Sequence, residues 1–171
     1  MICIAQLKDV DNLLPILFDA KRLLKESHSP QWQNDYPNKT VLIDDILSHH
    51  LYIYKEENEI LGFAAISTNG DHNYDEIYDG NWLSFFSSYI VIHRLAVKKE
   101  AHHKHIGKAF LDFAEELAKS KNINSIRVDT HHLNLVMQHL LEKEGYIKVG
   151  IIHLLSEKID FKRLAYEKII L

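Results

Sequence analysis

The chain has 171 residues, of which 46% are hydrophobic and 26% are charged, a composition typical of one globular domain. Its formal net charge is -4 with the histidines neutral, which excludes a strongly basic protein that recruits nucleic acid or an anionic membrane through its overall field. The single cysteine, Cys3, excludes an intramolecular disulfide and a zinc site built from several cysteines.

No stretch approaches the roughly 18 consecutive apolar residues that a membrane-spanning helix requires. The first residues, MICIAQLKDVDNLL, also lack the basic segment and the small-residue cleavage pattern of an export signal. We therefore expect a cytoplasmic protein that binds neither a membrane nor nucleic acid, with residues 1–171 forming one domain.

Hydrophobic periodicity predicts a strand, two helices and a hairpin in the first part of the chain. Leu13, Leu17 and Leu24 recur on one face of the first helix, which ends before the Pro-, Asn- and Ser-rich segment SHSPQWQNDYPN. The predicted elements are a strand over 3–7, a helix capped by Asp9 or Asp11, a helix over 40–50, and strands over 51–55 and 60–67.

The following connection, residues 69–88, is long for a compact domain, and such connections are often functional. Aromatic side chains interrupt this otherwise polar segment, which predicts that it packs against the rest of the domain. They are Tyr74, Tyr78, Trp82, Phe85 and Phe86.

Predicted strands and helices alternate in the second half of the sequence, as is typical of α/β proteins. The predicted strands cover 89–97, 125–130, 146–155 and 164–170, and the predicted helices cover about 104–120 and 133–141, with Gly145 ending the second. We therefore predict a single α/β domain without internal repeats.

The segment HRLAVKKEAHHKHIGKAF, residues 93–110, combines an apolar strand, a charged turn and the start of a helix at Gly107. Such a unit directs the first amides of the helix and its dipole toward the turn, which favours binding of an anion such as a diphosphate. Lys104 and Lys108 would add positive charge. One glycine and two lysines are also compatible with an ordinary solvated loop, so this alternative stays open.

The histidines of this turn raise the alternative of a metal site. His102, His103 and His105 could meet His131 and His132, because both groups follow neighbouring predicted strands. Zinc needs three or four converging ligands, and adjacent histidines on a loop usually point apart. We therefore expect no metal.

From residue 88 onward the sequence resembles the GNAT superfamily of acetyl-CoA-dependent N-acetyltransferases. The matching segments are HRLAV (93–97), HHKHIG (102–107) and KAFLDFAEELAKSKNINSIRVDTHHLNLVMQHLLEKEGY (108–146). The first half is similar in its order of elements and in the segment SPQWQNDYP. The resemblance implies the GNAT fold: one mixed, twisted sheet flanked by helices, in which a bulged strand is splayed from its parallel neighbour to admit acetyl-CoA.

The turn departs from the family pattern of Arg or Gln, two residues, Gly, one residue, and Gly or Ala. His102 and His105 take the first two of these positions, and only Gly107 fits. Backbone amides of residues 103–108 would then hold the diphosphate, and His105 would have to fit without a positive φ, or bind it more weakly. His102 would contact the diphosphate when protonated, so we expect tighter coenzyme binding as the pH falls toward 6.

The resemblance implies further contacts with the coenzyme. Backbone groups of residues 95–97 would pair with the pantetheine arm, and Asn134 matches a residue that commonly bonds the coenzyme. Asn134 could also cap the following helix, and the two roles are compatible. The expected coenzyme-binding residues are Leu95, Ala96, Val97, His102, His103, Lys104, His105, Ile106, Gly107, Lys108 and Asn134.

His93 is the predicted general base. Serotonin N-acetyltransferase, a member of the family, has a histidine at the matching place of a similar His-x-Leu-Ala-Val run, and histidine accepts protons near neutral pH. His93 could instead be a structural strand histidine. The usual tyrosine acid of the family is replaced by Leu141, so either Tyr146 or Tyr36 acts as the acid or the thiolate leaves without help. Tyr146 could instead be a core aromatic residue.

Trp32, Gln33 and Tyr36 lie in a loop that borders the acceptor site in the family, and we expect them to frame the substrate unless they fold the loop onto the core. Arg94 should point away from His93 and make a surface or structural pair, because strand side chains alternate. Asp129 could orient an amine or make a cap or a salt bridge.

The resemblance implies an N-acetyltransferase that moves an acetyl group from acetyl-CoA to a primary amine of a small molecule or peptide, by direct attack in a ternary complex. The alternative is a non-catalytic acetyl-CoA sensor of the same fold. Copies of the chain could pair as a homodimer, as family members do in several ways.

Overall fold

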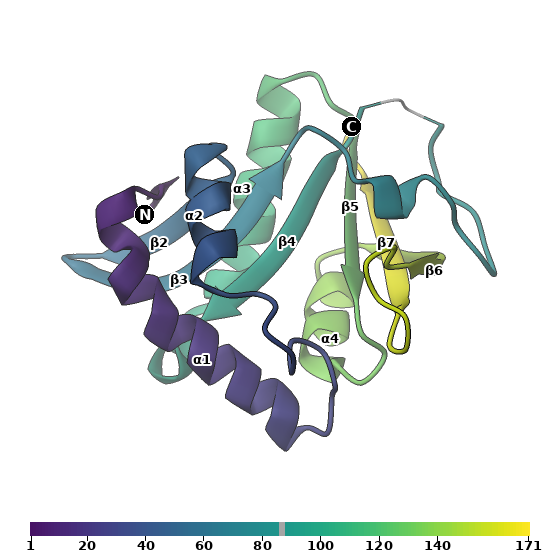
Figure 1. Cartoon of the computed structure of the whole chain (residues 1–171). Coiled ribbons are helices and arrows are strands. Elements are labelled where there is room, and N and C mark those ends of the chain that lie inside the picture. The colour runs from purple at the N-terminus through teal and green to yellow at the C-terminus, as the bar shows by residue number, and fades with distance from the viewer. Residues whose placement is uncertain (86–87) are drawn as a thin grey trace. The chain divides into compact units, whose positions relative to one another are not determined.

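The computed structural model describes residues 1–85 and 88–171 (Figure 1). The α-helices are α1 (Val10–Glu26), α2 (Lys39–Leu47), α3 (Ile106–Ser120) and α4 (Leu135–Lys143), and the 3₁₀ helices are η1 (Leu7–Asp9), η2 (His72–Tyr74) and η3 (Lys99–Lys104). The strands are β1 (Ile2–Ile4), β2 (Leu51–Glu56), β3 (Glu59–Ser67), β4 (Ile90–Val97), β5 (Ser125–Thr130), β6 (Ile147–His153) and β7 (Lys162–Ile169). Among these helices, none is long and apolar enough to cross a membrane.

The strands form one open mixed sheet in the order β1-β2-β3-β4-β5-β7-β6. Strands β4 and β5 run parallel, with Ile90 opposite Ile126 and Ile92 opposite Val128, and a crossover containing α3 joins them, as a parallel pair requires. The pairs β1–β2, β2–β3, β5–β7 and β6–β7 are antiparallel. The predicted α/β class with a mixed sheet is confirmed.

The predicted helices and strands are all present in the described part of the chain, and β5 has the predicted bounds. The main difference lies after β4, where the sequence predicts a loop and a helix from about residue 104. The chain instead forms η3 and begins α3 at Ile106. Short 3₁₀ helices have no extended apolar periodicity from which they could be predicted.

The chain divides into two compact units, which we describe separately. Unit 1 comprises Met1–Ile66 and His93–Phe110, and unit 2 comprises Ser67–Ile92 and Leu111–Leu171. Strand β4 and helix α3 therefore supply residues to both units.

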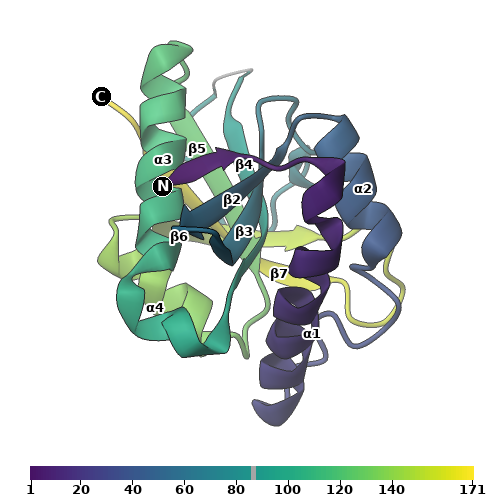
Figure 2. The same cartoon turned by 90° about the vertical axis from the view of Figure 1, so that its left-hand side faces the viewer.

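The core of unit 1 contains the apolar face of α1. Val10, Leu13 and Leu17 repeat at helical spacing and are buried in one cluster with Leu42 of α2 and Phe63 of β3. Full burial of a leucine or phenylalanine side chain contributes about 1.5–3 kcal/mol relative to leaving it exposed. Helices α1 and α2 also pack against each other (Figure 2).

A buried polar network lies inside unit 2. The Glu167 carboxylate of β7 is fully buried and accepts hydrogen bonds from Ser125 Oγ at 2.6 Å and Ser84 Oγ at 2.5 Å. It also accepts from Arg127 Nε at 3.3 Å and from the backbone N–H of Leu83. The β5–β7 register places Arg127 opposite Glu167, so the strand pairing itself brings the two charges together.

The connection between β3 and β4 packs within unit 2 through aromatic residues. The guanidinium of Arg127 lies 4.2 Å from the ring centroid of Trp82 and 4.1 Å from that of Tyr89, a cation–π arrangement with each ring. Tyr74 is buried, and its hydroxyl donates to Oδ1 of Asp129 at 2.7 Å. The predicted packing is confirmed for Tyr74 and Trp82, whose ring centroids lie 5.4 Å apart with the rings tilted at 45°.

The other three aromatic residues of this connection have different outcomes. Phe85 is fully exposed, so the prediction is wrong for this side chain. Phe86 lies outside the described residues. Tyr78 is partly exposed and stacks on the ring of His153 at a centroid distance of 4.0 Å.

Residues 78–81 cover part of the outer edge of β6. The backbone N–H and C=O of Tyr78 both bond to Ile151 at 2.8 Å, and the Asn81 N–H donates to the Val149 carbonyl at 3.1 Å. Gly80 permits this approach, because a Cβ at this position would lie 1.9 Å from the Val149 carbonyl oxygen.

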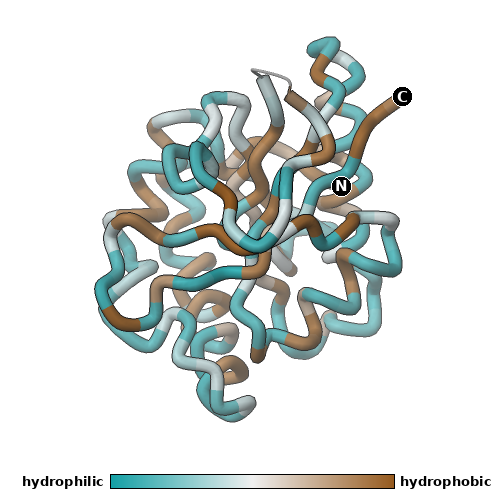
Figure 3. Tube along the Cα trace, turned by 90° about the vertical axis from the view of Figure 1, so that its right-hand side faces the viewer, coloured by the Kyte–Doolittle hydropathy of each residue, from teal (hydrophilic) through white to brown (hydrophobic). Residues whose placement is uncertain are grey.

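The chain ends in hydrophobic residues after β7 (Figure 3). Ile170 is buried, and its N–H donates to the Asn124 carbonyl at 2.9 Å, which fixes this end beside the start of β5. Leu171 is exposed.

Candidate functional site

The turn between β4 and α3 is the predicted anion site, and it lies within unit 1. The Lys98 N–H donates to the Leu61 carbonyl at 2.8 Å, and the Ala101 N–H donates to the Lys98 carbonyl at 2.9 Å. Buried Ala101 and Ile106 anchor the turn near its two ends, whereas residues 102–105 between them are exposed. The exposed part of the turn can therefore meet a ligand.

Helix α3 presents the amides of its first turn at this position. The first intrahelical bond joins the Ala109 N–H to the His105 carbonyl at 3.0 Å. The amides of Ile106 and Gly107 precede that bond, and helix geometry gives them no intrahelical acceptor. Together with the helix dipole, these free amides give the N-terminus of α3 an affinity for anions. This geometry is compatible with the predicted diphosphate site.

His105 joins η3 to α3 in a left-handed conformation, with a φ of 55°. The alternative in which His105 fits the turn without a positive φ is therefore wrong, and weaker binding of the diphosphate stays a prediction. The turn keeps the backbone geometry that favours glycine, although it carries a side chain at this position. A residue with a Cβ costs about 1 kcal/mol in this conformation relative to glycine.

Replacing His105 with glycine is expected to raise the free energy of unfolding by about 0.5–1 kcal/mol, because glycine adopts a positive φ without strain. The exposed His105 side chain gives up little packing. The gain corresponds to about 1–4 °C in Tm at this chain length, which thermal unfolding followed by circular dichroism can measure. His103→Gly, in exposed η3, is the matched control and should lower Tm; equal responses would contradict strain at His105.

The charged side chains of the turn have partners within unit 1. His102 Nε2 donates to the Val97 carbonyl at 3.1 Å. Lys104 pairs with Glu56 of the β2–β3 hairpin. The hydrogen bond to Glu56 holds the pKa of Lys104 above its ordinary value, so the lysine stays charged. A diphosphate at the turn would compete with the Glu56 carboxylate for Lys104.

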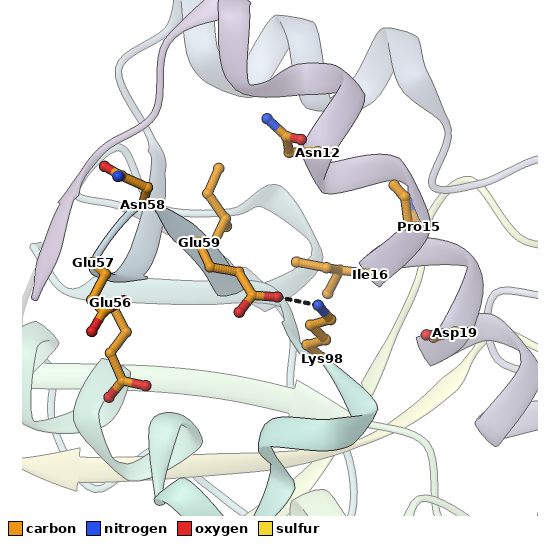
Figure 4. Close-up of a pocket in the computed structure, with 10 residues that line it drawn as sticks. Asn12, Pro15, Ile16, Asp19, Glu56, Glu57, Asn58, Glu59 and Lys98 are labelled. Atoms are coloured by element: carbon orange, nitrogen blue, oxygen red, sulfur yellow. Dashed lines mark hydrogen bonds and ion pairs between the residues drawn. The ribbon is translucent and has the colours of Figure 1, made fainter.

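A pocket of about 640 Å³ lies between α1 and the β2–β3 hairpin (Figure 4). Its lining includes the carboxylates of Asp19, Glu56, Glu57 and Glu59 together with Lys98, and Glu59 pairs with Lys98. A surface with this excess of negative charge repels an anionic coenzyme. The pocket is therefore unsuited to the diphosphate.

The second half of β4, residues 93–97, contains the predicted base and the predicted pantetheine-binding backbone. Arg94 has a φ of 52°, whereas a regular strand residue is extended. A left-handed residue inside a strand is typical of a β-bulge. Gly62 of β3 lies close to this segment, because a Cβ at Gly62 would lie 2.9 Å from the Ala96 carbonyl oxygen. His93 is partly buried.

The guanidinium of Arg94 links β4 to two other parts of unit 1. Its Nε and Nη2 each donate to one carboxylate oxygen of Asp45 in α2 at 2.7 Å, and its Nη1 donates to the Tyr36 hydroxyl at 2.7 Å. The side chains of Arg94 and Asp45 are 15% and 12% exposed. Burial lowers the pKa of Arg94, but Tyr36 and Asp45 raise it above its ordinary value. The predicted structural pair of Arg94 is confirmed.

The three residues of the predicted acceptor loop all contact the protein. Trp32 packs against the hydrophobic core of unit 1. The Gln33 side-chain amide donates to the carbonyls of Lys21 at 2.9 Å and Gln31 at 3.0 Å. Tyr36 bonds to Arg94 as described. These contacts support the alternative in which the residues fold the loop onto the protein, and their role toward a substrate stays a prediction.

Asn134 in unit 2 is the N-cap of α4. Its Oδ1 accepts the Met137 N–H at 3.2 Å, which confirms the capping alternative. Contact between Asn134 and the coenzyme stays a prediction.

Tyr146 is 2% exposed, and its hydroxyl has no hydrogen-bond partner among the described residues. Burial raises the pKa of Tyr146, and the charges of Glu115, Asp112 and Glu144 raise it further. Leu141, at the place of the usual family tyrosine, is fully buried. A general acid must reach the leaving thiolate, so this burial favours the core-aromatic alternative, and the catalytic role of Tyr146 stays a prediction.

Comparison with known proteins agrees with this arrangement. The sequence profile of the Acetyltransferase (GNAT) family matches residues 17–146. The chain belongs to the GNAT acetyltransferase family. A GNAT-family acetyltransferase from Streptococcus agalactiae is 31% identical over 100% of this chain and 95% of that chain, with a TM-score of 0.89.

More distant structures share the fold of this GNAT acetyltransferase. A ribosomal-protein-alanine N-acetyltransferase from Brucella melitensis is 15% identical, covers 99% of both chains and has a TM-score of 0.70. The acetyltransferase candidate yncA from Salmonella typhimurium, solved with its cofactor acetyl-CoA, is 12% identical over 100% of this chain and 94% of that chain, with a TM-score of 0.69. No curated protein sequence matches the chain. As a GNAT acetyltransferase, the chain is an acyl-CoA N-acyltransferase, and its family uses acetyl-CoA.

His131 of this acetyltransferase is buried and has two fixed partners in unit 2. Its Nε2 donates to Asp160 at 3.0 Å, and its Nδ1 accepts the Leu133 N–H at 3.1 Å. Burial lowers the pKa of His131, so the ring is neutral at pH 7. Within residues 1–85 and 88–171, no group of three or more His, Cys, Asp or Glu side chains is arranged to hold a metal ion.

Two side-chain hydrogen-bonded pairs in the acetyltransferase could not be predicted from the sequence. Asp45 lies 49 residues from Arg94, and Tyr74 lies 55 residues from Asp129. No local pattern connects residues so far apart. The one available signal was Arg94 itself, because a charge in an apolar strand needs a partner when it is buried.

Proposed function

We propose that this enzyme transfers the acetyl group of acetyl-CoA to the primary amine of a small molecule or peptide by direct attack in a ternary complex, with residues 1–171 acting as one acetyltransferase domain. The observation that carries the proposal is the turn after β4, where η3, left-handed His105 and the start of α3 follow one another in a GNAT chain. Acetyl-CoA supplies the acetyl group as a reactive thioester.

The backbone is expected to provide most of the coenzyme binding. Amides of residues 103–108 would hold the diphosphate, because N–H donors at a helix N-terminus bind phosphate whatever their side chains. His102 would add a contact: its Nε2 is engaged by the Val97 carbonyl, so protonation gives the ring a further donor at Nδ1. Residues 95–97 would pair with the pantetheine arm, and Asn134 would bond the coenzyme while capping α4.

Side chains from several elements are expected to serve the acceptor and the departing thiolate. His93 would take the proton of the attacking amine, directly or through water, because only a neutral amine is nucleophilic. Tyr36 or Tyr146 would protonate the departing thiolate, or the thiolate would leave unassisted. Trp32 and Gln33 would frame the amine with Tyr36, and the net charge of -4 favours a cationic acceptor.

Calorimetric titration with acetyl-CoA at pH 6.5 and 8.0 tests the coenzyme-binding part of this proposal. We expect a Kd in the micromolar range, about -8 kcal/mol, with tighter binding at pH 6.5 because protonated His102 offers an additional donor. His102→Ala should remove the pH dependence. His139→Ala, at an exposed position of α4, should keep it.

Affinity that is flat between pH 6.5 and 8.0 would contradict the role of His102. Absence of binding at both values would contradict the proposed function. Release of free CoA thiol in the presence of cationic amines, neutral amines and short peptides then measures turnover and identifies the acceptor class. If the protein binds acetyl-CoA but none of these acceptors is turned over, the result would point to the sensor alternative.

A further inference from the structure

Arg94 combines an unfavourable backbone conformation with a fully engaged side chain. Its φ of 52° lies in the left-handed region, which non-glycine residues inside strands avoid. Such strain persists only where the surrounding contacts hold it in place, and it is concentrated at functional sites. The contacts of Arg94 therefore require a functional explanation.

Those contacts come from two separate segments of unit 1. Asp45 in α2 receives a bidentate pair of hydrogen bonds from the guanidinium, and Tyr36 in the loop before α2 receives a third, all at 2.7 Å. The planar arginine fork matches a carboxylate in a way that the point charge of lysine cannot. The side chains of Arg94 and Asp45 are mostly buried, which limits the access of water that could substitute for either partner.

The residues beside Arg94 are the ones that the proposed reaction uses. His93 precedes it, and residues 95–97 follow it. The close approach of the Ala96 carbonyl to Gly62 fixes the chain after Arg94 against β3. The conformation of Arg94 therefore determines the direction that His93 takes relative to this fixed segment.

We propose that Arg94 is a positioning residue for acetyl transfer, acting through its paired bonds to Asp45 and its bond to Tyr36. The inference rests on the proposed function. The Asp45 bonds hold the bend of β4, and with it the orientation of His93 and of the backbone of residues 95–97. The Tyr36 bond ties the acceptor loop to the same guanidinium. The coenzyme strand and the acceptor loop are thereby coupled through one side chain.

Three variants separate these effects: Arg94→Lys, Asp45→Asn and Tyr36→Phe. The matched control is Arg22→Lys, because Arg22 makes an exposed ion pair with Asp19 at 2.8 Å. Thermal unfolding first verifies that each variant is folded. Hydrogen exchange of the peptide covering residues 90–97 in the ligand-free protein then reports on β4, and steady-state kinetics report on the reaction.

Arg94→Lys and Asp45→Asn should accelerate exchange in β4 and lower kcat/KM for acetyl-CoA about tenfold to a hundredfold, since small misplacement of reacting groups has effects of this size. Tyr36→Phe should raise KM for the acceptor about tenfold or less while the Kd of acetyl-CoA stays unchanged, and it should lower kcat as well if Tyr36 is the general acid. The control should match the wild type in every measurement.

Arg94→Lys with wild-type exchange and wild-type kcat/KM would overturn the inference. A lower Tm with unchanged kinetics would also overturn it, because that result indicates a purely structural pair. If the wild type binds no acetyl-CoA, the proposed function fails on its own. Exchange in the ligand-free variants still decides whether Arg94 holds β4: faster exchange supports this, and unchanged exchange refutes it.

Discussion

Replacing His93 with glutamine is expected to lower kcat by a factor of about 10²–10⁴, the usual contribution of a positioned general base. Glutamine keeps a hydrogen-bonding side chain of similar length but cannot take a proton from the amine at neutral pH. The Kd of acetyl-CoA should change by about threefold or less, because coenzyme binding is assigned to the turn and to the backbone of residues 95–97. Steady-state kinetics and calorimetry measure the two quantities.

The pH dependence makes the His93 test more specific. The kcat/KM of the wild type should fall at low pH as the base becomes protonated, and His93→Gln should lose this limb of the profile. His139→Gln, at an exposed position of α4, controls for the loss of a histidine. A His93→Gln enzyme that keeps both its rate and its acidic limb would identify His93 as a structural strand residue.

Replacing Arg127 with methionine is expected to lower the free energy of unfolding by about 3–5 kcal/mol. The Glu167 carboxylate is fully buried, and the variant would leave it without its counter-charge. The cation–π contacts of Arg127 with Trp82 and Tyr89 would be lost as well. At this chain length the loss corresponds to about 6–20 °C in Tm. Urea unfolding at pH 7 and thermal unfolding would both register it.

An exposed ion pair gives the appropriate comparison for Arg127. Lys119 pairs with Glu116 at 3.1 Å on the surface of α3, and exposed pairs contribute about 1 kcal/mol at most. Lys119→Met should therefore unfold nearly as the wild type does. If Arg127→Met behaved like Lys119→Met, the buried network would have little influence on the stability of unit 2.

The helices and strands were predictable because their patterns are local. The stripe on α1 and the alternation of Ile126 and Val128 with polar residues in SIRVDT of β5 each identify their element without reference to distant residues. Helix η3 was not predictable, because its sequence KEAHHK buries only Ala101 and shows no apolar period. The predicted packing of Phe85 was wrong for a related reason. An aromatic side chain favours burial, but its presence in the sequence does not show whether the chain brings it to the core.

In the candidate site, too, the features set by local sequence could be predicted and those set by tertiary structure could not. The cap formed by Asn134 follows from a rule about four consecutive residues, and the structure confirms it. The left-handed His105 violates the local preference for glycine, because buried Ala101 and Ile106 fix the path of the turn from both ends. The pairing of Arg94 with Asp45 depends on tertiary structure alone. The sequence indicated that Arg94 needs a partner but could not identify Asp45 as that partner.

The covered edge of β6 limits how copies of this protein can associate. An exposed edge strand presents unpaired N–H and C=O groups on which another chain can add a strand, the usual start of edge-to-edge aggregation. Residues 78–81 occupy these groups at Ile151 and Val149, so a second copy cannot lengthen the sheet there without displacing them. The other edge strand, β1, spans only Ile2–Ile4. Strand addition between copies would therefore have to displace residues 78–81 or rely on the three residues of β1.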